Sequence, residues 1–228
     1  MQPSEVEAVT IAVGQTHTVS GLLWMPPRPR ACYVIAHGAG AGMAHPFMQA
    51  IAAGLATRDI ATLRYQFPYM EKGSRRPDAP KLAQATVRAA VAQAALLAPT
   101  LPLVAGGKSF GGRMTSQAQA IAPLAGVQGL AFLGFPLHPA GKPSSNRAKH
   151  LAEVKIPMLF VQGTRDSLAE LKLLEPVVNS LGPSATLHRV EAADHSFHVP
   201  ARSGRNDREV MNEILDAFAA WIGAIAAS

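Results

Sequence analysis

Short apolar runs and longer amphipathic segments alternate along most of this chain. Two β-like runs come first, at 6–13 and 18–25, and the turn at 14–16 between them predicts an antiparallel hairpin. After the proline-rich stretch 26–29, strand-like and helix-like segments follow one another to the end. The predicted strands are CYVIAHG (32–38), ATLRYQF (61–67), PLVAGG (102–107), GLAFLGFP (129–136), PMLFVQG (157–163) and ATLHRVE (185–191), and the predicted helices cover about 46–57, 81–97, 112–122, 168–181 and 207–226.

This alternation, with nearly continuous apolar strands, predicts an α/β fold: a mostly parallel central sheet covered by helices on both faces, preceded by the hairpin. A chain of 228 residues holds one sizeable domain, and no repeat or linker divides it, so we expect a single domain over 1–228. The connection between 136 and 157 has room for about one helical turn, which is too short for a large lid.

The amino-acid composition and the charge of the chain argue against several classes of binding partner. A hydrophobic content of 48% with 16% charged residues argues against disorder, and the net charge of +6 is scattered along the chain. No leader segment and no apolar run of about 18 residues is visible, and the single Cys32 excludes a disulfide within the chain. We therefore expect a soluble, cytoplasmic protein with neither a nucleic-acid nor a membrane partner; the oligomeric state stays open. The densest basic cluster lies among acidic residues in a loop that we expect to be solvated, and consists of Lys72, Arg75, Arg76 and Lys81.

Two glycine-rich segments suggest nucleotide binding, and both fail the test of context. The tripeptide GKS at 107–109 resembles the end of a P-loop, but Pro102 stands where the first glycine of that motif is required. The segment GAGAG at 38–42 follows a strand, but Met43 occupies the place of the third glycine in a dinucleotide fingerprint. Neither segment predicts a nucleotide site.

The pentapeptide GKSFG at 107–111 fits a third motif, the nucleophile elbow G-x-S-x-G. In that motif a serine occupies a sharp turn between a strand and a helix, so that its hydroxyl stands clear of the sheet. Here a predicted strand comes immediately before the motif and a predicted helix immediately after it. The context favours Ser109 as a nucleophile.

A nucleophilic serine needs a base and an acid that orients the base. Asp166 follows the predicted strand 157–163 and His195 follows the predicted strand 185–191, so both should lie with Ser109 at the carboxyl edge of the sheet. We therefore expect Asp166, His195 and Ser109 to act together. His198 is the rival base, and Asp194 is a weaker candidate acid because adjacent loop residues rarely point at one another.

The remaining site predictions concern the loop after the first parallel strand. An oxyanion hole should combine the N–H of Phe110 with one from that loop, for which we expect Ala39, with Gly38 as the alternative. Further candidate contacts for a substrate are His37, Gly40, Lys108 and His138. Lys108, together with Arg75 and Arg76, hints at an anionic acyl group, although the favoured interpretation is a lysine that faces solvent. We expect walls from 43–47, 67–76 and 138–150 around an open, shallow cleft.

The chain resembles the α/β-hydrolase superfamily over essentially its whole length, and within it the compact, lidless branch near the dienelactone hydrolases. RYQFPYM (64–70), GFPLHP (134–139), FVQGTRD (160–166) and DHSF (194–197) are similar to a subgroup named for testis-expressed protein 30, which also includes a subunit of a chromatin acetyltransferase complex. Typical dienelactone hydrolases carry cysteine at the elbow, where this chain has Ser109, so their substrate does not carry over.

The resemblance implies the triad Ser109, Asp166 and His195 and an oxyanion loop at 37–40. We expect a serine hydrolase that cleaves a small acyl ester, thioester or lactone through an acyl-enzyme intermediate, with no cofactor and no metal. The alternative is a catalytically silent α/β-hydrolase-fold protein that serves as a binding or adaptor module.

Overall fold

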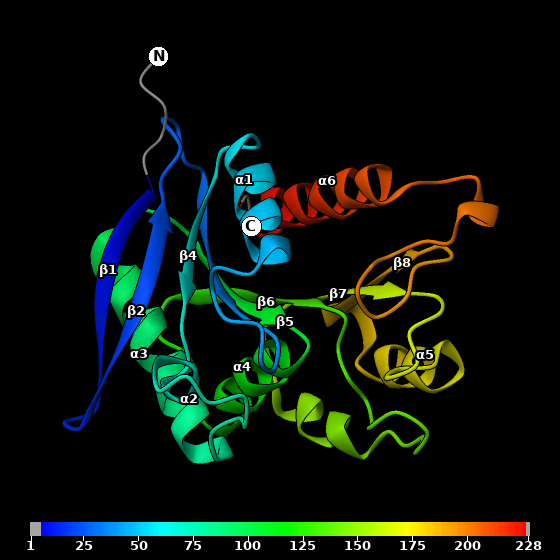
Figure 1. The fold of residues 1–228 in the computed structure, drawn as a ribbon, viewed down its shortest axis with the longest axis horizontal. Coiled ribbons are helices and arrows are strands. Elements are labelled where there is room, and N and C mark those ends of the chain that lie inside the picture. The colour runs from blue at the N-terminus through cyan, green and yellow to red at the C-terminus, as the bar shows by residue number, and fades with distance from the viewer. Residues whose placement is uncertain (1–5, 227–228) are drawn as a thin grey trace.

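The computed structural model describes residues 6–226, which form an eight-stranded sheet with helices on both faces (Figure 1). The predicted domain covers 1–228, and residues 1–5 and 227–228 lie outside the described part. In chain order the elements are β1 (Val6–Val13), β2 (His17–Trp24), β3 (Ala31–Ala36), α1 (Pro46–Ala56), β4 (Ile60–Tyr65), α2 (Pro68–Glu71), α3 (Pro80–Leu97), β5 (Leu103–Lys108), α4 (Phe110–Ile121), β6 (Val127–Leu133), η1 (Asn146–Glu153), β7 (Met158–Gly163), α5 (Leu171–Ser180), η2 (Gly182–Ser184), β8 (Ala185–Val190), η3 (Ala201–Ser203) and α6 (Asp207–Ala226).

The order of the strands creates a crevice at one edge of the sheet. The order is β1-β2-β4-β3-β5-β6-β7-β8; β1 pairs with β2 and β2 with β4 in antiparallel fashion, and the strands from β4 to β8 run parallel. The predicted hairpin and mostly parallel sheet are confirmed. From β3 the chain crosses to β4 on one side and then to β5 on the other, so the loops after β3 and β5 diverge at a topological switch point, where open α/β sheets bind ligands.

Two apolar cores cover the two faces of the sheet. Alternate residues of a strand point to opposite faces, and in β3 Tyr33 and Ile35 pack with α1 and α6, whereas Cys32 and Val34 belong to the core under α3, α4 and α5. Figure 1 shows α1 and α6 on one side of the sheet and α3, α4 and α5 on the opposite side. Because every residue of β3 is buried, the strand that leads into the crevice is held rigidly from both sides.

The structure differs from the sequence prediction mainly between the regular elements. The helix α4 begins at Phe110 rather than near 112, directly after Ser109. The short helix α2, with Pro68 in its first turn, was not predicted. Between 136 and 157, where about one helical turn was expected, the 3₁₀ segment η1 is longer, with eight residues. No lid-like insertion follows β6, as expected. Within residues 6–226, none of the helices combines the length and the apolar character of a membrane span.

Candidate active site

Ser109 occupies a strained turn between β5 and α4, with φ 50° and ψ −112°. The glycines on either side allow the turn to approach β3 closely. A Cβ on Gly107 would lie 2.3 Å from the carbonyl oxygen of Ala36, and one on Gly111 would lie 2.6 Å from the carbonyl oxygens of Ala36 and His37. Real Cβ contacts are not this short, so any larger residue would push the turn away from β3. The local requirements of the G-x-S-x-G motif are therefore met.

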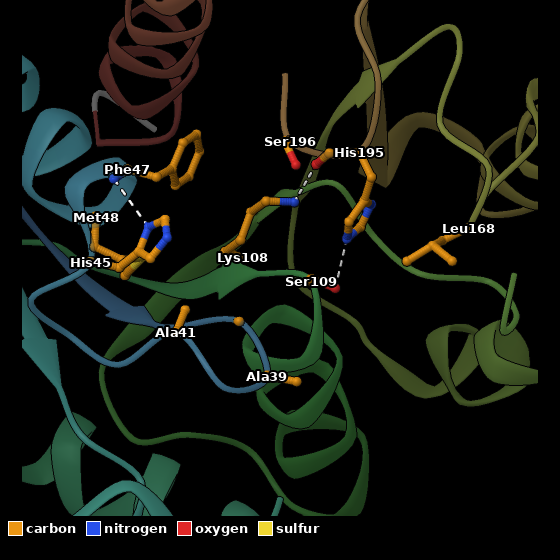
Figure 2. Close-up of a pocket in the computed structure, with 11 residues that line it drawn as sticks. Ala39, Ala41, His45, Phe47, Met48, Lys108, Ser109, Leu168, His195 and Ser196 are labelled. Carbon is orange, nitrogen blue, oxygen red and sulfur yellow. Dashed lines mark hydrogen bonds between the residues drawn. The ribbon is translucent and has the colours of Figure 1, made fainter. Parts of the chain in front are cut away.

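A continuous line of hydrogen bonds joins Ser109 to two distant segments of the chain. His195, in the loop after β8, lies with Nε2 2.9 Å from Ser109 Oγ and with Nδ1 2.6 Å from Asp166 Oδ2 (Figure 2 shows the Ser109–His195 bond). A carboxylate next to Nδ1 favours the tautomer that carries its proton there, which leaves Nε2 to accept the serine proton. The geometry is that of a base placed to activate a hydroxyl.

The carboxylate of Asp166 is buried, with 2% of the residue exposed, and accepts hydrogen bonds from three donors. Oδ1 accepts the N–H of Leu168 at 2.8 Å, and Oδ2 accepts the side-chain amide of Gln162 as well as His195. Gln162 in turn accepts the N–H of Phe135 at 2.9 Å. These bonds fix the carboxylate plane and compensate for its burial. Gln162 was not predicted, although a polar residue in a fully buried strand is a signal that could have drawn attention to it.

The competing histidines and acids are engaged elsewhere. Asp194 caps its own turn, because Oδ1 accepts the N–H groups of Ser196 and His198 at 2.7 and 3.0 Å. His198 is exposed and pairs with Asp207 at 2.9 Å, which raises the pKa of the imidazole. Further from the elbow, His150 contacts Ser116, and His188 contacts Glu213.

His37 and Gly40 hold the loop after β3 in shape. The His37 ring is fully buried: Nδ1 donates to the carbonyl oxygen of Gly38 at 2.7 Å, and Nε2 accepts the N–H of Phe67 at 3.2 Å. Burial lowers the pKa of this imidazole to about 4, and the bond to Gly38 partly opposes the shift. The N–H of Gly40 donates to the hydroxyl of Tyr69 on α2 at 2.9 Å, a contact that the sequence pattern did not predict. Neither His37 nor Gly40 lines the pocket. The prediction that these two residues contact a substrate is therefore not supported.

Two backbone N–H groups next to Ser109 or in the loop after β3 have no acceptor among the described residues. Ala39 and Gly38 both line the pocket beside Ser109. Among the hydrogen bonds of the described residues, none uses the N–H of Ala39 or of Phe110. Phe110 is the first residue of α4, and a helix leaves its first N–H groups without partners inside the helix. These two N–H groups are the pair expected from the sequence for an oxyanion hole.

The pocket above Ser109 has a volume of about 390 Å³ (Figure 2). The expected wall at 43–47 contributes His45 and Phe47, and Met48 extends it along α1. The segments 67–76 and 138–150 supply no lining residue; Leu168 and Ser196 line the pocket instead.

The other predicted contacts are placed as follows. Lys108, expected to face solvent, instead extends into the pocket. His138 is buried outside the pocket lining, with Nδ1 2.9 Å from the carbonyl oxygen of Pro139. Arg75 and Arg76 are exposed on the segment between α2 and α3 and do not line the pocket. Within the described residues, no cluster of three or more His, Cys, Asp or Glu side chains could hold a metal ion.

Comparison with known proteins places this geometry in context. A family model described as an alpha/beta hydrolase domain matches residues 29–223. Among solved structures, a dienelactone hydrolase from Anabaena variabilis superposes with a TM-score of 0.79 at 21% identity, covering 97% of this chain and 98% of that one. XC6422 from Xanthomonas campestris, described as an a/b serine hydrolase without lid, gives 0.73 at 21% identity, with 96% of each chain covered. Est1E from Butyrivibrio proteoclasticus gives 0.68 at 16% identity, covering 93% and 99%. At these identities, the structural likenesses establish the fold alone.

Proposed function

The chain belongs to the alpha/beta hydrolase domain family, and from this premise we propose that it is a serine hydrolase with Ser109, His195 and Asp166 as its catalytic triad. The observation that carries the proposal is the chain of hydrogen bonds from Asp166 through His195 to Ser109, which ends in the pocket. Two N–H groups beside Ser109 have no hydrogen-bond acceptor among the described residues. The solved structures similar to this chain include a dienelactone hydrolase, a protein described as an a/b serine hydrolase without lid and one described as an alpha-beta serine hydrolase homologue, which is consistent with a hydrolase.

The geometry supports a two-step acyl transfer. Ser109 Oγ attacks the substrate carbonyl carbon while His195 Nε2 takes its proton, and Asp166 stabilises the resulting imidazolium. The oxyanion accepts hydrogen bonds from the N–H groups of Ala39 and Phe110. His195 then gives the proton to the leaving group, and an ester remains on Ser109. Water attacks this acyl-enzyme by the same route and releases the acid.

The size and walls of the pocket support a small acyl group on the substrate. Its walls include Phe47, Met48 and Leu168, which suit a small acyl group, and no lid encloses a long chain. We propose small acyl esters, thioesters or lactones as substrates. We also propose membership of the testis-expressed protein 30-like subgroup, on the motifs RYQFPYM (64–70) and DHSF (194–197).

Labelling with a fluorophosphonate probe tests this function, because the probe forms a stable bond only with an activated serine. Mass spectrometry should place the adduct on Ser109, and Ser109→Ala should abolish both labelling and hydrolysis of p-nitrophenyl butyrate. Ser196→Ala is the matched control, because Ser196 lines the same pocket and makes no side-chain bond to His195; this variant should label normally. Folded wild-type protein that takes no label on Ser109 would support the adaptor alternative.

A further inference from the structure

Lys108, the residue before Ser109, places its ammonium group inside the pocket. Nζ donates to the carbonyl oxygen of His195 at 2.6 Å and lies 5.9 Å from the ring centroid of Phe47 and 5.3 Å from that of Phe197 (Figure 2 labels Lys108, Phe47 and His195). Both distances fall within the range of cation–π attraction. Three segments far apart in sequence, the end of β5, the start of α1 and the loop after β8, therefore surround one positive charge beside the elbow.

No carboxylate neutralises this charge directly. Among the described residues, no Asp or Glu oxygen lies within 4.0 Å of Lys108 Nζ. Asp166 and Asp194 attract it from further away, but the oxygens of Asp166 already accept bonds from three donors, and Asp194 Oδ1 caps its own turn. Burial lowers the pKa of this ammonium to about 8. Near neutral pH it is therefore a partly buried cation.

An ammonium has three N–H donors, and the carbonyl of His195 occupies one of them. The aromatic rings attract the charge but accept no strong hydrogen bond. A partly dehydrated cation in a mostly apolar pocket gains most from an anionic partner, because charges interact more strongly where water is excluded. The described residues around the pocket provide no such partner within 4.0 Å, which leaves the position open to an anionic group of the substrate.

We propose that Lys108 determines specificity by binding a carboxylate on the acyl part of the substrate, so that the preferred substrates are monoesters of short dicarboxylic acids. This proposal rests on the proposed hydrolase function. Hydrolysis of such a monoester consumes one water molecule and releases the alcohol and the dicarboxylate. The carboxylate on Lys108 stays in place while the carbonyl at the other end of the acyl chain reacts with Ser109.

The bond from Lys108 to His195 also suggests a simpler role, in which the lysine only anchors the histidine loop. The two roles differ in one measurable quantity. Loosening the loop lowers kcat/KM for every substrate by the same factor, whereas loss of a carboxylate site lowers it only for anionic substrates. The ratio of kcat/KM values for an anionic substrate and its neutral isostere therefore separates them.

The test compares monoethyl malonate, succinate, glutarate and adipate with the matching ethyl ester amides, in which a neutral amide replaces the carboxylate. For the best chain length, wild type should prefer the anion by about 10- to 100-fold, the range expected for a hydrogen bond to a charged group. Lys108→Met should bring the ratio close to one, and Lys108→Arg should keep most of the preference. Lys72→Met is the control, because it removes the same charge from an exposed loop residue and should leave the ratio unchanged.

Several results would overturn the proposal. One is a preference of the wild-type enzyme for the neutral amides at every chain length. This result would be decisive even if the Lys108 variants fail to fold. Another is an equal fall for both substrates in Lys108→Met, which would assign the residue to positioning of His195. Calorimetric titration of Ser109→Ala with glutarate keeps the two hypotheses apart. If no ester is hydrolysed, the proposed function fails. Glutarate binding that is lost in Lys108→Met would still support the carboxylate site. No binding of glutarate would refute the carboxylate site.

Discussion

Acid should destabilise this protein through His37, and the structure allows the effect to be sized. The ring is completely buried, and Nε2 accepts the N–H of Phe67, so protonation there would break that bond and leave a charge without a partner. For this reason the pKa of His37 falls from the ordinary value of 6.5 to about 4 in the folded protein. In the unfolded chain the same imidazole takes up a proton near its ordinary value.

The sign and the magnitude follow from proton linkage. Between pH 6.5 and pH 4 the unfolded state binds one more proton at His37 than the folded state, so stability is lost as the pH falls through this window. The slope approaches about 1.4 kcal/mol per pH unit. From pH 7 to pH 5, His37 alone should lower the free energy of unfolding by roughly 2 kcal/mol. This is a sizeable part of the total for a typical domain, which is about 5–15 kcal/mol.

Urea unfolding at pH 7 and pH 5, followed by circular dichroism, measures this loss in wild type and in His37→Asn. The variant should be less stable at pH 7 but should lose roughly 2 kcal/mol less on acidification. Burial and Arg113 also lower the pKa of His150 to about 4, so the wild-type loss includes a share from that residue, and only the difference between the two proteins isolates His37.

The control is His198→Gln, because Asp207 raises the pKa of His198 and gives its contribution the opposite sign. That contribution is present at low pH and is lost as the pH rises, so its removal should not reduce the sensitivity to acid. Equal losses in wild type and His37→Asn would refute the reasoning. Nuclear magnetic resonance of the wild-type ring gives an independent answer if the variant does not fold: a His37 that titrates near 6.5 would show that its burial does not resist protonation.

Two further predictions concern the candidate active site. Asp166→Asn should lower kcat by about 10³- to 10⁴-fold, because His195 would lose its orientation and tautomer, whereas Asp194→Asn should be mild, since that carboxylate caps a turn; the reverse order in ester assays would show that the acid is wrongly assigned. The kcat/KM for p-nitrophenyl esters should stop rising beyond an acyl chain of about six carbons, because an open pocket buries few further methylenes and each is worth about 0.8 kcal/mol; a steady gain out to long chains would indicate a deep apolar pocket.

The parts of this site that could be predicted from sequence are those fixed by strand ends. Ser109, Asp166 and His195 each follow a strand of the parallel part of the sheet, where the strand ends share one edge, so their proximity follows from topology. The glycines around Ser109 likewise mark a turn that approaches its neighbour closely. Local pattern and fold agree at these positions, which is why a linear motif was informative.

The orientation of the Lys108 side chain could not be predicted from the positions of the strand ends. It is the last residue of β5, and the strained turn that follows removes the simple alternation of side chains between the faces of a sheet. Its surroundings come from Phe47 at the start of α1 and Phe197 after β8, two segments whose meeting depends on tertiary packing. Tyr69 on α2 escaped prediction for a related reason, because a helix of four residues leaves almost no periodic signal.

The strained backbone at Ser109 bears on the choice between a hydrolase and an adaptor. A non-glycine residue held at φ 50° and ψ −112° costs of order 1–3 kcal/mol and persists only where its surroundings impose it. Here they impose it by close contact: Gly107 and Gly111 bring the turn against Ala36, and the Ser109 N–H is tied to the carbonyl of Leu133 at 3.1 Å. A binding surface would gain nothing from this conformation, because a relaxed turn could present the same pocket walls. A nucleophile does gain from it, since the turn presents Oγ to His195 while the next N–H, on Phe110, is left for the oxyanion. A catalytic role of Ser109 would account for the strain, which is the physical ground on which we favour the proposed hydrolase over the adaptor.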